Sequence, residues 1–168
     1  MRDTNTVTVE LDVPSSIGML EAADVLVEHV AAAAGFDPDS SQAIQMALHE
    51  ALVNAIVHGN DEDETRRVNV ELAARADGVV VRVRDEGRGF DPTRVPDPLS
   101  AEGLCKPSGR GVFLMRMLMD EVAFRQLANG GMEVTLRKRH SACEEAPFAP
   151  RASGSVRIHH DGYGPGRA

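Results

Sequence analysis

Three polar side chains recur at every fourth position of a mostly apolar stretch, HEALVNAIVHGN, at residues 49–60. They are the carboxylate of Glu50, the amide of Asn54 and the imidazole of His58, groups that exchange protons or bind metals. Residues four apart on an α-helix are neighbours, with about 5–6 Å between Cβ atoms, so the three form one row. A solvated helix face explains the row equally well, although Met46 and the adjacent Ala, Val and Ile residues make its surroundings apolar.

The rest of this helix limits what the row can do. A zinc-protease helix is excluded, because its second histidine would stand where this chain has Val53. Large apolar residues form a second stripe about 160° away around the axis, at 3.6 residues per turn. The stripe consists of Ile44, Leu48, Leu52 and Ile56. We therefore expect the stripe to pack on a sheet while the polar row faces another part of the molecule.

A second motif, DEGRGF at residues 85–90, directly follows a predicted strand. A carboxylate at a strand end, here Asp85, can accept a hydrogen bond from an amino group. Gly87 and Gly89 permit backbone conformations that other residues avoid, and they let a ligand approach closely. A plain turn has the same composition, so this motif alone does not define a site.

A third motif, SGRGVFLM at residues 108–115, places two glycines at the start of a predicted helix. Free N–H groups at such a position attract phosphate, and Gly109 and Gly111 leave room for it. No G-K-[ST] follows, so the motif is not a Walker loop.

Composition excludes several classes of protein. The chain has 168 residues, 42% of them hydrophobic, which predicts one folded domain. A net charge of −8 disfavours direct binding to nucleic acid, which requires a positive surface. Two cysteines without metal-ligand spacing, no apolar signal region and no run of transmembrane length predict a soluble protein of the cytoplasm, with no membrane partner.

Hydrophobic periodicity predicts an α+β fold: a two-layer α/β sandwich in which helices cover one face of a mixed, mostly antiparallel sheet. The first helix is expected to open at Ser15 or Ser16 and close at Gly35, and the second to open at Ser40 or Ser41 and close at Gly59. The expected strands are residues 6–13, 66–74, 79–84, 121–127 and 132–139, with a short helix at 112–120. Residues 1–139 form the predicted domain, and the Ala-, Pro- and Gly-rich residues 140–168 a flexible tail.

In this order and at these separations, the three motifs resemble the N, G1 and G2 boxes of the GHKL ATPases, which share the Bergerat ATP-binding fold. The resemblance covers about residues 6–138 and is strongest to the anti-sigma-factor serine kinases of the RsbW-like group. It implies ATP and Mg²⁺ as cofactors. It also implies two partners, a sigma factor and a STAS-type anti-anti-sigma protein that the kinase phosphorylates, and a homodimer.

The resemblance also implies roles for individual residues. Glu50 is the general base, Asn54 the Mg²⁺ ligand, and Asp85 the acceptor of the adenine amino group. Gly87 and Gly89 shape the base pocket. Gly109, Arg110 and Gly111 wrap the phosphates, with Lys106 as a further cation from the loop that forms the ATP lid. His58 has either a structural hydrogen bond or a ligand contact.

Two other functions fit the same motifs. One is a non-catalytic ATP-binding anti-sigma or switch module, which would need no base at Glu50. The other is the detached catalytic domain of a histidine kinase, which is disfavoured because no helix with a phospho-acceptor histidine precedes the motifs. Phosphate transfer to a partner serine distinguishes the serine kinase from both.

Overall fold

The computed structural model describes residues 7–89, 107–140 and 155–159. Their strands form a six-stranded sheet in the order β4-β5-β3-β2-β1-β6. All neighbouring strands are antiparallel except β1 and β6, which are parallel, so the sheet is mixed as expected. The strands are β1 (Val7–Pro14), β2 (Arg67–Arg75), β3 (Gly78–Asp85), β4 (Glu121–Gln126), β5 (Met132–Arg139) and β6 (Ser155–His159).

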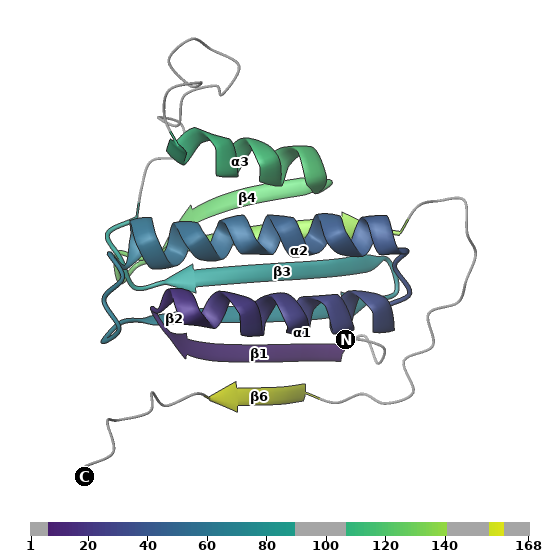
Figure 1. The fold of residues 1–168 in the computed structure, drawn as a ribbon, viewed down its shortest axis with the longest axis horizontal. Helices are drawn as coiled ribbons and strands as arrows, with labels where there is room; N and C mark the ends of the chain where they lie inside the picture. The colour runs from purple at the N-terminus through teal and green to yellow at the C-terminus, as the bar shows by residue number, and fades with distance from the viewer. Residues whose placement is uncertain (1–6, 90–106, 141–154, 160–168) are drawn as a thin grey trace.

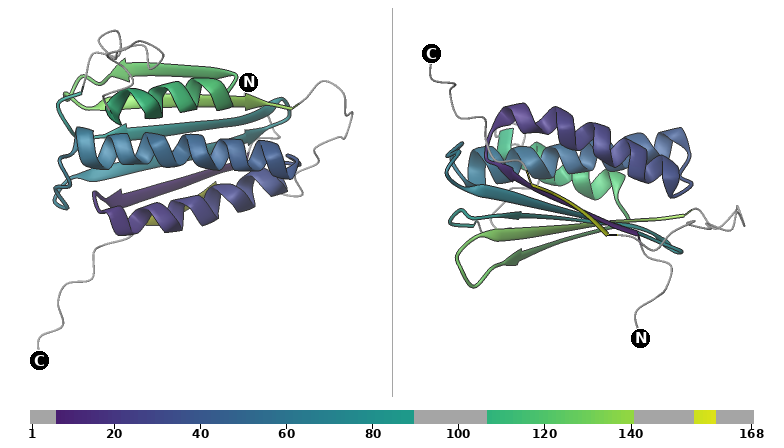
Figure 2. Two further views of the ribbon diagram at one scale, coloured as in Figure 1. Left: turned by 45° about the horizontal axis from the view of Figure 1, so that its top comes forward. Right: turned by 90° about the horizontal axis from the view of Figure 1, so that it is seen from below.

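The helices lie together on one face of this sheet (Figures 1 and 2), which confirms the predicted two-layer sandwich. In Figure 1, α2 crosses the middle of the sheet between α1 and α3. The helical elements are η1 (Ile17–Met19), α1 (Leu20–Ala33), α2 (Pro38–Val53), the π-helical segment η2 (Asn54–Gly59) and α3 (Pro107–Leu118).

Alternation along the strands builds the core. In β2, Val68, Val70 and Leu72 are fully buried beneath the helices, while the residues between them point to the other face. The apolar stripe of α2 is also buried, each of its four side chains being at most 1% exposed, as the periodicity predicted. Burial of each large aliphatic side chain contributes about 1.5–3 kcal/mol, so the stripe fixes which side of α2 faces the sheet.

The helix ends differ from the sequence-based expectations. The N-cap of α2 is Asp37, whose carboxylate accepts hydrogen bonds from the backbone N–H and hydroxyl of Ser40, so the prediction of Ser40 or Ser41 was wrong. Pro38 at the first helical position favours this earlier start. Gly35, with a φ of 85°, closes α1 as predicted, because the left-handed conformation suits glycine.

The C-terminal segment also differs from expectation. Residues 155–159 pair with β1 as strand β6, in register from Thr8 opposite Ser155 to Asp12 opposite His159. The expectation of a tail without regular structure was therefore wrong for these five residues. The domain boundary near residue 139 remains a prediction.

Salt bridges cross the sheet face that the helices leave uncovered. Glu133 on β5 accepts hydrogen bonds from Arg84 at 2.6 Å and from Arg125 at 2.8 Å. Its side chain is only 7% exposed, whereas Arg125 is 68% exposed. Burial opposes ionisation of Glu133, but the two guanidinium groups outweigh it and hold the pKa of this carboxyl below its usual value.

The variant Glu133→Gln should lower the free energy of unfolding by about 2 kcal/mol at pH 7, because it removes the buried carboxylate that Arg84 and Arg125 share and leaves Arg84 with the longer 3.2 Å contact to Glu71. Because the folded pKa is depressed, this stabilisation is present above the unfolded value of 4.5 and is lost as the pH falls through the folded pKa. Urea unfolding at pH 7 and at low pH measures both effects. The control is Glu121→Gln, an exposed partner of Arg139, which should cost less than about 1 kcal/mol. Equal losses for the two variants would contradict the analysis.

Candidate functional site

The N-terminal half of the candidate site forms where α2 changes to π geometry. The N–H of Asn60 donates to the carbonyl of Ala55, five residues earlier, at 2.8 Å, which is π-type bonding. Single π turns inside helices are frequent at functional sites. Gly59 ends this segment instead of following it as a left-handed cap, so that prediction was wrong.

Glu50 and Asn54 face the start of α3, as the spacing of the motifs suggested. A Cβ placed on Gly111 would lie 2.6 Å from Oε2 of Glu50 and 3.6 Å from Nδ2 of Asn54. A larger residue at position 111 would therefore displace the carboxylate. The structure thus brings together two helices that are more than fifty residues apart in the sequence, with the carboxylate and the amide at their junction.

The side-chain amide of Asn54 is unsatisfied. Its Nδ2 is buried and has no hydrogen-bond partner in the described part of the chain. The oxygen and nitrogen of an asparagine amide have nearly the same shape, so rotating the amide by half a turn would put Oδ1 in the place of Nδ2. A buried unpaired amide costs about 1–3 kcal/mol, so this position suits a ligand that supplies the missing interaction.

His58, the third residue of the row, lies in the π segment and is exposed, whereas the amide nitrogen of Asn54 is buried. Within residues 7–89, 107–140 and 155–159 it makes no hydrogen bond or ion pair, so a structural hydrogen bond is not observed there. A ligand contact of His58 stays a prediction.

Asp85 is the buried acid of the site, at the end of β3 and only 6% exposed. Its Oδ1 accepts from the backbone N–H of Gly87 at 2.9 Å and of Met132 at 3.2 Å. Gly59 packs against the same carboxylate, since a Cβ there would lie 2.7 Å from Cγ of Asp85. Burial raises the pKa of Asp85, and the two N–H groups and the charge of Arg66 only partly offset this.

Glycines allow three backbone segments to meet around Asp85. A Cβ on Gly87 would lie 1.9 Å from the carbonyl oxygen of Gly59, and one on Gly131 would lie 1.9 Å from that of Asp85. Gly89 has a φ of 71°, which other residues rarely adopt. Gly87 thus lies beside Asp85, and Gly89 lies against Gly130 and Gln126, so the predicted base pocket around the two glycines stays a prediction. Sequence reasoning missed the close approaches at Gly59 and Gly131.

Asn60 is a further residue that sequence reasoning missed. It is fully buried, its Nδ2 donates to the carbonyl of Arg67 at 3.0 Å, and its Oδ1 accepts from the N–H of Glu86 at 2.9 Å. It therefore ties the end of η2 to the segment that carries Asp85. Its position after glycine and before an acidic run is typical of exposed turns, so the sequence held no signal of its burial.

The phosphate-side residues are placed only in part. Helix α3 begins at Pro107, earlier than predicted, so Gly109, Arg110 and Gly111 lie inside its N-terminal part. Arg110 is exposed, and no acidic residue lies in the first turn, which leaves the positive end of the helix dipole available to an anion. Lys106 lies outside the described residues.

The described residues contain no cluster of three or more His, Cys, Asp or Glu able to hold a metal ion. They also contain no helix long and apolar enough to cross a membrane. A magnesium ion carried with a nucleotide needs no such cluster, because it keeps waters and phosphate oxygens as ligands and takes one or two from the protein. Asn54, with its unpaired amide, fits that requirement.

Comparison with known proteins identifies the family. Residues 13–138 match the family model described as the histidine kinase-like ATPase domain, and the chain belongs to this family. The match includes both α2 with its π segment and the glycines around Asp85.

Individual relatives agree with this. The chain is 29% identical to the serine-protein kinase RsbW of Bacillus subtilis, over 77% of this chain and 84% of that protein. It is 36% identical to the anti-sigma F factor of Geobacillus stearothermophilus, over 67% of this chain and 78% of the relative. A crystal structure of the RsbU and RsbW domains of a Mycobacterium tuberculosis protein is similar in fold, with a TM-score of 0.56 and 20% identity. That similarity covers 79% of this chain but only 31% of the solved one.

The raised pKa of Asp85 predicts how stability changes with pH in the variant Asp85→Asn. Ionising the buried carboxyl opposes folding, so wild-type stability falls as the pH rises from the unfolded value of 3.8 through the raised folded pKa. The variant has no such ionisation, so its free energy of unfolding should rise relative to that of the wild type as the pH increases across this window. Urea unfolding between pH 3 and 7 measures the difference. Parallel curves for the two proteins would contradict a raised pKa, and Asp77→Asn in the exposed β2–β3 turn serves as the control.

Proposed function

We propose that this chain is an ATP-dependent protein-serine kinase that acts as an anti-sigma factor. The observation that carries the proposal is the junction of α2 and α3, where Glu50, Asn54 and the helix end at Gly111 meet. A base, a metal ligand and a helix N-terminus together are the parts that phosphate transfer needs, since positioning and charge stabilisation supply most of its catalysis. The relatives named serine-protein kinase and anti-sigma F factor support the same function.

In this proposal each residue acts through its own chemistry. Asp85 accepts a hydrogen bond from the adenine amino group, while its Oδ1 stays bound to the backbone N–H groups of Gly87 and Met132. Asn54 holds Mg²⁺, which neutralises phosphate charge when it is bound. Glu50 takes the proton from the attacking serine hydroxyl. The N-terminus of α3, with Gly109, Arg110 and Gly111, and Lys106 from the preceding loop bind the phosphates.

The proposed partners follow from the same family. A sigma factor is held inactive, and a STAS-type anti-anti-sigma protein supplies the serine that is phosphorylated. We propose a homodimer as the working form, and the cytoplasm, where sigma factors act, as its location. The test below also decides against the alternative, an ATP-binding switch that transfers no phosphate.

The variant Asp85→Asn should bind ADP about 100-fold more weakly than the wild type. In the variant, the amide oxygen would keep the two backbone N–H groups as partners, so its NH₂ would face the amino group of the base, donor against donor. Isothermal titration calorimetry at pH 7 measures the affinity, with Asp77→Asn as the control. Unchanged ADP affinity would refute the assignment of Asp85 to the base.

The variant Glu50→Gln should bind ATP normally and transfer phosphate about 10²–10⁴-fold more slowly, because it keeps the shape of the side chain and removes the base. Asn54→Ala should weaken both triphosphate binding and transfer, since it removes the metal ligand. The measurement uses labelled ATP, purified protein and STAS proteins recovered from the native cell by pull-down with ATP and with ADP.

Glu64→Gln, in the exposed turn after η2, is the control for removing one carboxylate. Wild-type transfer rates in Glu50→Gln would show that Glu50 is not the base. Binding of a sigma factor without labelling of any STAS protein would favour the non-catalytic switch.

A further inference from the structure

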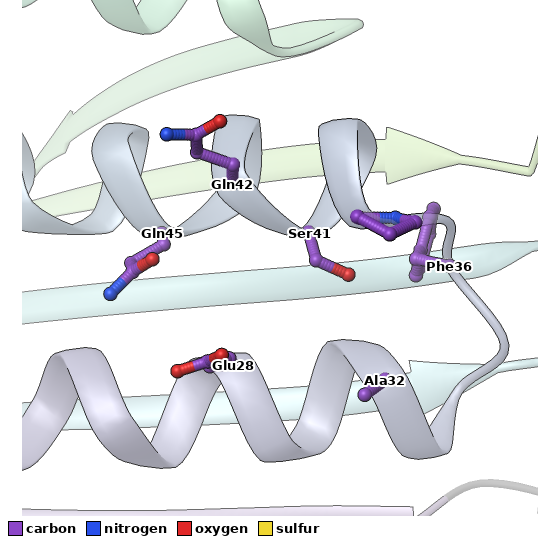
Figure 3. Close-up of a pocket in the computed structure, with 7 residues that line it drawn as sticks. Glu28, Ala32, Phe36, Ser41, Gln42 and Gln45 are labelled. Atoms are coloured by element: carbon purple, nitrogen blue, oxygen red, sulfur yellow. The ribbon is translucent and has the colours of Figure 1, made fainter.

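A groove lies between α1 and α2, toward the C-terminal end of α1 and the N-terminal end of α2, away from the junction with α3. It has a cavity volume of about 410 Å³, which is the size of many ligand sites. Glu28 and Ala32 line it from α1, and Ser41 and Gln45 from α2 (Figure 3). Pro38 and Gln42 complete the α2 side.

The floor of the groove is apolar and held in place. Phe36, only 9% exposed, lies at its closed end, and its ring stacks on that of His140 with 4.3 Å between centroids. His140 follows β5, so the sheet supports the aromatic floor from below. The Asp24 carboxylate of α1 and the His49 imidazole of α2, 2.9 Å apart, hold the two helices together one turn beyond the groove.

One polar group inside the groove lacks a partner. Ser41 is only 8% exposed, and in the part of the chain that the structure describes its hydroxyl makes no hydrogen bond. Figure 3 shows the side chains of Ser41 and Gln45 directed from α2 toward α1, where Glu28 and Ala32 lie. The hydroxyl oxygen can therefore accept a hydrogen bond from a ligand in the groove.

The polar groups around the groove are suited to a cation. The carboxylate of Glu28 accepts only, and the amide oxygens of Gln42 and Gln45 and the hydroxyl of Ser41 are further acceptors. The surrounding chain also favours a cation, because residues 15–65 contain ten Asp and Glu residues and no Lys or Arg. This stretch includes all of α1 and α2, so these two helices attract positive charge.

From these features we infer that the groove is a docking site for a basic segment of a partner protein. A lysine or arginine side chain lays its aliphatic part over Ala32 and Phe36 and places its charged end between Glu28, Gln45 and the hydroxyl of Ser41. We take a protein as the source of this cation because the acidic residues of α1 and α2 extend beyond the groove, so a segment with several basic side chains meets more of them than a single small cation does. The inference requires neither ATP binding nor phosphate transfer, so it stands or fails independently of the proposed kinase.

The test is a titration of the full ¹⁵N-labelled chain, followed by NMR, with an amphipathic helical peptide built from Ala, Leu and Lys. The same peptide with Glu in place of Lys is the matched probe. Resonances of Glu28, Ser41, Gln42 and Gln45 should shift with the lysine peptide and not with the glutamate peptide. Free N-acetyl-lysine amide should bind at the same residues but much more weakly.

Three variants separate the groove from general attraction to an acidic surface. Glu28→Lys should raise the dissociation constant of the lysine peptide about tenfold, by removing and reversing the charge at the site. Glu64→Lys makes the same charge change in the exposed turn after η2 and should raise the dissociation constant less than about threefold. Ala32→Leu fills the groove without changing charge and should also weaken binding. Circular dichroism confirms that each variant is folded.

Equal losses in Glu28→Lys and Glu64→Lys would overturn the inference, and so would undiminished binding by Ala32→Leu. Shifts concentrated at residues 61–64, or no shifts with the lysine peptide, would also overturn it. None of these outcomes alters the affinity for ADP or the transfer of phosphate, so the kinase proposal is tested separately.

Discussion

The close approach of backbones around the Asp85 carboxylate is the constraint on which the site depends. Three chain segments, at Gly59, Gly87 and Gly131, come within contact distance because none of them carries a side chain there. The carboxylate is held by N–H groups from the segment that follows β3 and from the first residue of β5, so it cannot rotate without breaking bonds to both. A buried acid held this way presents one oxygen in a fixed direction, which is the preorganisation that recognition of one face of a base requires.

Asn60 extends this constraint to the helical layer. Its hydrogen bonds to the first residue of β2 and to the segment after β3 place the end of η2 relative to the sheet. Asn54 begins η2, and Glu50 lies one turn before it. The same two bonds therefore set the distance between the adenine end of the proposed site, at Asp85, and its phosphate end, at Glu50 and Asn54. Stability on the uncovered sheet face comes from different residues, namely the arginines around Glu133, so that face and the site can vary independently.

Sequence reasoning succeeded where one local period decides the structure. The apolar stripe of α2 and the alternation in β2 identified both layers. The first motif lies against both others, through Glu50 at Gly111 and through Gly59 at Asp85, while the roles of these residues stay predictions. The N-cap at Asp37 was missed because serine three or four residues later is an equally good cap by type, and only the chain path decides between them.

The other differences arise from tertiary contacts. A period of 3.6 residues does not reveal a π segment, so the change of helix geometry after Val53 was not predicted. The burial of Asn60 depends on β2 and β3, and the pairing of β6 depends on the free edge of β1, both distant in sequence. Five residues, SVRIH, alternate too briefly within a Gly- and Pro-rich region to predict a strand.

Because of the π segment, the number of residues between Asn54 and Asn60 determines how Asn60 is oriented toward the sheet. Hydrogen bonds from residue i to i+5 hold one residue more per turn than an α-helix does, so the segment carries surplus chain. Deleting one residue there would let α-helical bonding continue with little rotation of Asn60 about the helix axis, whereas inserting one would turn Asn60 by about 100°. The two hydrogen bonds of Asn60 would then point away from the segments that they now join. The segment should therefore tolerate the loss of one residue more readily than the gain of one, and the burial of Ala55 and Ile56 restricts substitutions within it.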